Sequence, residues 1–260
     1  MTTDTDDSPV PDPHEDRAVV LASGGMDSAT AAYEALARGY DQLYLLHTTY
    51  GQHTADRERA CAEALSRHVD AADLLVVDTS HLADIGASSL TTDAGTVDDA
   101  DLESVAGTAT EQSSGDEPRD SDGVPDSYVP FRNANLLSMA VSYAEANGCT
   151  AVFIGAHSED YSGYPDCRPA FFRAFQDVVD RGTSPAADIS IEAPFVDATK
   201  TDIAERGLEL DVPYEDTWSC YRSEAPACGT CDACAYRLQA FQRAGVVDPI
   251  EYEQRPDYTD

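Results

Sequence analysis

Residues 23–28, with the sequence SGGMDS, constrain the fold more than any other segment of this chain. They follow the apolar run 18–22 and precede the helix-like stretch 28–38, so the local order is strand, glycine turn, helix. Paired glycines allow a tight turn and a close approach to a ligand. The first N–H groups of a helix have no intrahelical acceptor and suit an anion such as phosphate. The segment therefore predicts a phosphate-binding loop, with an ordinary serine-capped Gly-Gly turn as the alternative.

Apolar runs alternate with helical patterns along most of the chain. This alternation predicts an α/β fold with a parallel sheet and helices on both faces. Ligands of such sheets bind at the carboxyl ends of the strands, where the glycine turn would lie. The expected strands are 18–22, 43–47, 74–78, 151–156 and 189–193, and the expected helices are 28–38, 55–69, 133–147, 168–181 and 199–206.

Two segments interrupt this pattern. Residues 1–16 are acidic and contain proline, and residues 91–126 are rich in Asp, Ser, Thr and Gly with few apolar side chains. Such compositions cannot bury enough apolar surface to offset the entropy of ordering. We therefore expect a disordered acidic tail at 1–16 and a flexible insertion at 91–126. The nucleotide-binding domain would span 17–210 and a small cysteine-containing module 211–260.

The formal net charge of −33 limits the partners of the chain. The tail and the insertion account for only part of this charge, so the folded body is acidic as well. Few basic side chains are available to neutralise phosphates, which argues against direct nucleic-acid binding. One interpretation is adaptation to concentrated intracellular salt, where charge repulsion is screened. No run of about twenty apolar residues indicates a membrane span, and no signal region is visible, so we expect a cytoplasmic protein.

Lys200 is the only lysine among sixteen basic residues. Because an ammonium group meets a phosphate as a compact charge that arginine does not reproduce, we predict Lys200 as a phosphate or transition-state ligand. A surface lysine is the alternative. In the glycine turn, Ser23 and Ser28 can donate hydroxyl hydrogen bonds. Asp27 would hold a magnesium ion or accept an orienting hydrogen bond.

Four of the seven cysteines, Cys220, Cys228, Cys231 and Cys234, are clustered near the C-terminus. Their C-x7-C-x2-C-x2-C spacing is typical of tetrahedral zinc ligation. Four thiolates would complete the coordination shell, so the predicted zinc is structural. An iron–sulfur cluster or a redox pair from one C-x2-C are the alternatives.

The SGGxDS loop resembles that of the PP-loop ATP pyrophosphatase superfamily, whose members cleave ATP between the α and β phosphates. Together with the cysteine tail, other motifs resemble one of its families, the 7-cyano-7-deazaguanine (preQ0) synthase, or QueC, family. These motifs are YGQ at 50–52, VPFRN at 129–133, EDYSGYPDCRP at 159–169, TK at 199–200 and TWSCY at 217–221. Two places differ from the family pattern: Phe131 replaces a glycine, and His53, Thr54 and Arg57 replace the residues that usually follow Tyr-Gly-Gln.

The resemblance implies a PP-loop fold and an ATP-dependent ligase that converts 7-carboxy-7-deazaguanine and ammonia to preQ0 for tRNA modification. It also implies a homodimer that needs ATP, zinc and magnesium. The catalytic residues would be Lys200, Asp27 and Ser28. The substrate would be held by Arg132, Asp160, Tyr161, Tyr164, Asp166 and Arg168. The nucleotide would be bound by Ala22, Ser23, Gly24, Gly25, Met26, Asp27, Ser28, Ala29, Thr30, Ala31 and Ala32.

Three other functions compete with this interpretation. A tRNA-thiolating PP-loop enzyme would use its cysteines for sulfur or a cluster, but it needs tRNA contacts that an acidic surface disfavours. Amidating ligases related to NAD synthetase lack the cysteine tail. A zinc-ribbon adaptor with a degenerate nucleotide fold would not turn over ATP. Turnover of ATP with the carboxy-deazaguanine therefore separates these hypotheses.

Overall fold

The computed structural model describes residues 16–85, 97, 99–100, 128–158 and 164–259. The predicted tail lies outside the described residues except for Asp16. The predicted insertion lies outside them except for residues 97, 99 and 100. Asp160 and Tyr161, two predicted substrate-binding residues, also lie outside.

A five-stranded sheet forms the centre of the molecule, with the strand order β3-β2-β1-β4-β5 and every neighbouring pair parallel. The predicted α/β class with a parallel sheet is confirmed. Strands β2 and β3 are added on one side of β1. After β3 the chain crosses to the other side, where β4 pairs with the free edge of β1. The strands are β1 (Arg17–Leu21), β2 (Gln42–Thr49), β3 (Asp73–Asp78), β4 (Ala151–Phe153) and β5 (Ser190–Glu192).

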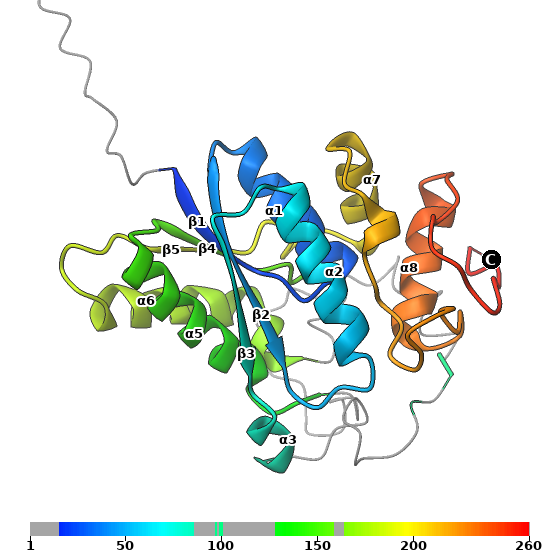
Figure 1. Cartoon of the computed structure of the whole chain (residues 1–260), viewed down its shortest axis with the longest axis horizontal. Helices are drawn as coiled ribbons and strands as arrows, with labels where there is room; N and C mark the ends of the chain where they lie inside the picture. Colours follow the sequence, from blue (N-terminus) through cyan, green and yellow to red (C-terminus); the bar gives the residue numbers. More distant parts are fainter. Residues whose placement is uncertain (1–15, 86–96, 98, 101–127, 159–163, 260) are drawn as a thin grey trace, which may run out of the picture.

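Because β1 has apolar residues on both faces, helices must cover both faces of the sheet. Successive side chains of a strand point to opposite faces. Ala18 and Val20 belong to one buried core, and Val19 and Leu21 belong to the other. Figure 1 shows the corresponding helices: α5 and α6 lie on one side of the strands, and α1, α2 and α7 lie on the other.

Five of the described helices, α1, α2, α5, α6 and α7, match the predicted ones, with ends shifted by up to three residues, whereas the short α3 was not predicted. The later stretch that the pattern missed is α8, which forms inside the cysteine-containing region. The helices are α1 (Met26–Ala37), α2 (Ala55–His68), α3 (His81–Ile85), α5 (Arg132–Asn147), α6 (Pro169–Gly182), α7 (Lys200–Glu209) and α8 (Asp232–Arg243), with short 3-10 turns at η2 (Pro165–Cys167) and η3 (Tyr214–Asp216).

The C-terminal region packs directly against the sheet domain. Helix α8 lies beside α7, and its residues Ala240 and Phe241 belong to the same buried core as β1 and α1. Part of the predicted insertion also reaches this region, because Ala100 N donates to Thr230 O at 2.7 Å and Arg222 pairs with Asp99 at 2.7 Å. Among the described helices, none is long and apolar enough to cross a membrane.

Candidate active site

A cavity of about 250 Å³ opens at the carboxyl ends of the strands. Ser23 follows β1, Thr48 is the second-last residue of β2 and Gly155 follows β4, and all three residues line it. Trp218, Ser219 and Tyr221 close another side. The cavity therefore lies where the sheet topology predicts a ligand site, between the parallel sheet and the start of the cysteine region.

The glycine turn lies in this cavity wall and depends on the absence of a side chain at Gly24. Its φ of +86° favours glycine, and an added Cβ would lie 2.3 Å from the backbone oxygen of Glu58 in α2. Gly25 N donates to Ser23 Oγ at 3.3 Å, and Ser23 Oγ donates to Ser28 Oγ at 3.0 Å. The turn is therefore built to present a serine-lined backbone to the cavity.

A second close approach fixes the start of α1 against β4. An added Cβ at Gly155 would lie 2.8 Å from the carbonyl carbon of Asp27 and 2.9 Å from Ser28 N. Only a residue without a side chain allows this contact without a shift of the backbone. Gly155 therefore places the N-terminus of α1 directly beside the end of β4.

Lys200, Asp27 and His157 meet at one end of the cavity. Lys200 Nζ donates to Asp27 Oδ2 and lies 3.3 Å from His157 Nε2, which lies 3.8 Å from Asp27 Oδ2. Lys200 is the first residue of α7, directly after Thr199, whose side chain accepts from Asp202 N in a capping box. The side chain of Lys200 is 13% exposed, so the single lysine is not a free surface residue.

The two carboxylate oxygens of Asp27 differ in their contacts: Oδ2 accepts from Lys200, and Oδ1 does not. Its Oδ1 atom is buried and has no hydrogen-bond partner within the described part of the chain. A buried polar oxygen is normally paired with a protein group, a water or an ion, and oxygen atoms such as those of carboxylates are the ligands that Mg²⁺ prefers. The donor set therefore fits a magnesium ion held by Asp27.

Apart from Gly24, which is not among the cavity-lining residues, the predicted nucleotide-binding residues divide into two groups. Ala22, Ser23, Gly25, Asp27 and Ser28 line the cavity. The structure places the side chains of Met26, Ala29, Ala31 and Ala32 in the core below the loop, and Thr30 is hydrogen-bonded there to Tyr214 at 2.8 Å. These five residues position α1 rather than face the cavity.

Arg132 and Tyr50 form an aromatic–cationic pair in the cavity wall. Arg132 Nη1 donates to the Tyr50 hydroxyl at 3.1 Å, and its guanidinium carbon lies 5.2 Å from the Tyr50 ring centroid. Burial raises the pKa of Tyr50 to about 12, so the phenol stays neutral at physiological pH. This pair supplies a positive charge beside a flat aromatic face.

The other predicted substrate residues are placed differently from one another. Tyr164 lines the cavity beside Cys167. Asp166 is buried and accepts from Asn133 N at 2.8 Å, at the first turn of α5. It therefore orients Asn133 and lies behind the cavity wall. Arg168 is the N-cap of α6 and is not among the residues that line the cavity.

His157 and Glu58 are cavity residues that the sequence did not predict, and Tyr50 was named only as part of the YGQ motif, without a role in the site. His157 lies four residues beyond the end of β4, and Tyr50 follows β2, so position after a strand was the available signal. Glu58 gave no such signal. It lies within α2 and reaches the cavity only because the glycine turn packs against that helix.

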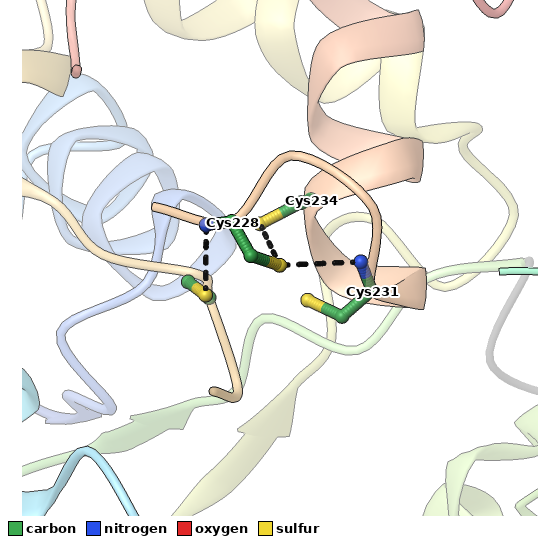
Figure 2. A group of neighbouring side chains, drawn as sticks. Cys228, Cys231 and Cys234 are labelled. Carbon is green, nitrogen blue, oxygen red and sulfur yellow. Dashed lines mark hydrogen bonds between the residues drawn. The ribbon is translucent and has the colours of Figure 1, made fainter. Parts of the chain in front are cut away.

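The four clustered cysteines are buried, and their sulfur atoms all lie within 4.8 Å of one another. Figure 2 shows Cys228, Cys231 and Cys234 gathered beside the first turn of α8. The Cys228 and Cys234 sulfurs are 3.8 Å apart, and Cys231 N donates to Cys228 Sγ at 3.3 Å. Backbone N–H groups aimed at sulfur stabilise thiolates, so the geometry fits a metal ion with four sulfur ligands.

A protein-family model matches the segment that contains both the glycine turn and the cysteine cluster. The family model described as "Queuosine biosynthesis protein QueC" matches residues 17–245, which include both the glycine turn and all four clustered cysteines. The chain belongs to the QueC family. The resemblance read from the sequence motifs is thereby confirmed, and the QueC match spans the sheet and most of the C-terminal region.

Relatives of high identity carry one name. The 7-cyano-7-deazaguanine synthase of Haloarcula marismortui is 69% identical over 94% of this chain and 98% of its own length. The proteins of that name from Halobacterium salinarum and Methanospirillum hungatei are 65% and 50% identical, over 94% and 91% of this chain and 98% and 99% of their own. The solved NMN synthetase of Francisella tularensis is 17% identical, with a TM-score of 0.42 over 90% of this chain and 79% of its own.

Proposed function

We propose that this QueC protein is a 7-cyano-7-deazaguanine synthase that converts 7-carboxy-7-deazaguanine and ammonia to the nitrile at the expense of ATP. The observation that supports this most strongly is the 69% identity to a relative of that name along almost the whole of both chains. The cavity adds support, because the PP-loop turn, Lys200 and Asp27 meet in its wall. The product would serve deazaguanosine modification of tRNA, without tRNA binding to this protein.

The chemistry requires activation of oxygen as a leaving group. The substrate carboxylate attacks the α-phosphate of ATP, pyrophosphate departs, and ammonia displaces AMP to give the amide. The amide oxygen then attacks a second ATP, pyrophosphate departs again, and loss of AMP and both amide protons leaves the nitrile. One ATP is consumed for each oxygen removed, so the balance predicts two AMP and two pyrophosphate per nitrile.

The chain's own residues would act by positioning and charge. The loop backbone with Ser23 and Ser28 would bind the departing pyrophosphate. Lys200 would offset the negative charge that develops at the phosphates, an effect worth about 10²–10³ in rate for a single group. Arg132, Tyr50 and Tyr164 would hold the flat substrate in the aromatic part of the cavity.

Two metals would serve different purposes. Magnesium held by Asp27 would neutralise phosphate charge on ATP. Zinc held by Cys220, Cys228, Cys231 and Cys234 would be structural, because four thiolates leave no position for water. This zinc would stabilise the region that contributes Trp218, Ser219 and Tyr221 to the cavity. A homodimer, as the resemblance implies, remains a prediction.

The decisive experiment incubates the purified protein with Mg-ATP, ammonium and 7-carboxy-7-deazaguanine. We expect the nitrile and two equivalents of AMP by mass spectrometry. AMP formation without nitrile would indicate another PP-loop reaction, and no turnover would favour the adaptor hypothesis. Metal analysis of the same sample should find one zinc per chain; iron with visible absorbance would contradict the zinc assignment.

A further inference from the structure

Glu58 places a carboxylate in the wall of a cavity that is proposed to bind anions. It lies in the first turn of α2 and lines the cavity together with Tyr50 and Arg132. An acidic side chain in this place repels both ATP and the carboxylate of the substrate. Its presence therefore calls for a ligand group that donates hydrogen bonds.

Neighbouring side chains hold the Glu58 carboxylate in one orientation. Thr54 Oγ1 donates to Glu58 Oε1 at 2.7 Å, and Gln52 Nε2 donates to Oε2 at 3.0 Å. Gln52 is in turn fixed by Tyr50 N, which donates to its Oε1 at 2.7 Å. Each carboxylate oxygen keeps a further lone pair. The group is thus a preoriented, two-oxygen acceptor.

A two-oxygen acceptor matches one edge of a guanine-like heterocycle. The N1–H and N2–H groups of 7-deazaguanine lie side by side and donate in parallel, so a carboxylate can accept both. Adenine offers a donor beside a lone pair on its corresponding edge, which a carboxylate would repel. The chemistry of Glu58 therefore favours the deazaguanine over the adenine of ATP.

The Glu58 carboxylate and Lys200 come from opposite sides of the cavity. Glu58 follows β2, whereas Lys200 follows β5, and β1 and β4 lie between these strands in the sheet. A substrate with a reactive carboxylate at one end and donor groups at the other could therefore span from Lys200 to Glu58. Arg132 and Tyr50 lie beside Glu58, where they could contact the ring.

On the basis of the proposed function, we infer that Glu58 is the residue that selects the substrate, by accepting hydrogen bonds from the N1–H and 2-amino groups of the deazaguanine. It makes no covalent contribution to the reaction. Its removal should impair recognition of the heterocycle and leave ATP binding unchanged.

Burial also makes the contribution of Glu58 to stability depend on pH. Desolvation raises the pKa of Glu58, so the folded protein favours the protonated form more than the unfolded chain does. That preference contributes stability at low pH and is lost as the pH rises through the raised pKa. Above that raised pKa the ionised carboxylate is a cost to the unliganded fold, which the hydrogen bonds from Thr54 and Gln52 partly offset.

The test compares Glu58→Gln with Glu63→Gln as the matched control. Glu63 lies on the same helix and pairs with Arg59, with its side chain 42% exposed. Calorimetry measures binding of 7-carboxy-7-deazaguanine and of its analogue without the 2-amino group, 7-carboxy-7-deazahypoxanthine. We expect wild type and E63Q to prefer the 2-amino compound by at least about tenfold. E58Q should bind it about 10–100-fold more weakly, with little preference left.

Two further measurements separate the possible results. The KM for ATP should be equal in E58Q and wild type, and the Tm of unliganded E58Q at pH 7 should not fall. The inference would be overturned if E58Q kept its preference for the 2-amino compound, or if only its KM for ATP increased. A lower Tm with unchanged selectivity would also overturn it, because it would indicate a purely structural role. Nitrile formation by wild type is scored separately: its absence rejects the proposed function, while the binding ratio still decides the role of Glu58.

Discussion

The parallel sheet and the cysteine region both line the cavity, but they are stabilised in different ways. The sheet is held by many small apolar contacts, spread over two buried cores on its faces. The cysteine region has a small apolar cluster and depends on four thiols and one fully buried ion pair, Arg237 with Asp248. Dispersed packing tolerates single changes, whereas a ligand set or an ion pair does not.

The two regions meet at the glycine turn. Trp218 N donates to Gly24 O at 2.8 Å, and Thr54 Oγ1 lies 3.3 Å from the carbonyl oxygen of Cys220. The geometry of the predicted phosphate loop is therefore held partly from the cysteine region. Perturbing that region should affect ATP binding, although none of its residues belongs to the turn.

Loss of the metal site should give the largest effect. Replacing Cys231 with serine removes one of four ligands, and structural zinc contributes on the order of 10 kcal/mol to local folding. We expect loss of bound zinc, rapid proteolysis between residues 217 and 260, and a raised KM for ATP. The control is Cys149→Ser, a buried cysteine outside the cluster, which should keep its zinc. Full zinc content in Cys231→Ser would contradict the four-thiolate site.

The Arg237–Asp248 pair should be the next most sensitive point. Arg237 donates to Asp248 through Nε at 2.7 Å and Nη2 at 3.0 Å, and both side chains are 0% exposed. Asp248→Asn would leave a buried guanidinium without its counter-charge, at a cost of ~3–5 kcal/mol in unfolding free energy. Urea denaturation measures this loss. A change below ~1 kcal/mol, as for surface pairs, would show that the region tolerates exchange as the sheet does.

Lys200 should separate activity from stability. Lys200→Ala removes the proposed phosphate contact, and we expect a decrease in kcat of about 10²–10³-fold with the fold retained. Circular dichroism and zinc content should match wild type, in contrast to Cys231→Ser. A fully active Lys200→Ala would remove the proposed role of the single lysine.

The smallest effect concerns Phe131, where the family pattern has glycine. Phe131 has φ of +57° and is 61% exposed, so a bulky residue occupies a left-handed conformation that glycine adopts readily. We expect Phe131→Gly to change the unfolding free energy by at most ~1 kcal/mol, because relief of strain offsets loss of the Phe171 contact. Thermal denaturation tests this. A large destabilisation would show that the exposed aromatic contact matters more than the backbone.

The sequence predicted the elements that have a clear local pattern and did not predict those that depend on distant contacts. Strands β1 to β4 were found because each contains a run of apolar residues, and the four cysteines were found by their spacing. Helix α8 was missed because its apolar residues are interleaved with cysteines and polar side chains, and because the buried Arg237 in its middle finds its partners, Asp248 and Thr217, outside the helix. The sequence predicted Asp166 as a substrate residue but not its contact with Asn133 N, and Asp166 is not among the residues that line the cavity.

By itself, the sequence determined the α/β class, the glycine turn at a strand end and the four-cysteine cluster, because these depend on local periodicity and spacing. Tertiary structure alone brought His157 to Lys200 and Asp27, and Glu58 into the same cavity. Such residues are distant in the chain and meet only when the parallel strands align their carboxyl ends and α2 packs on Gly24. A Cβ at Gly24 would collide with the backbone of Glu58. The local sequence shows the glycine, but it does not show which helix packs against it.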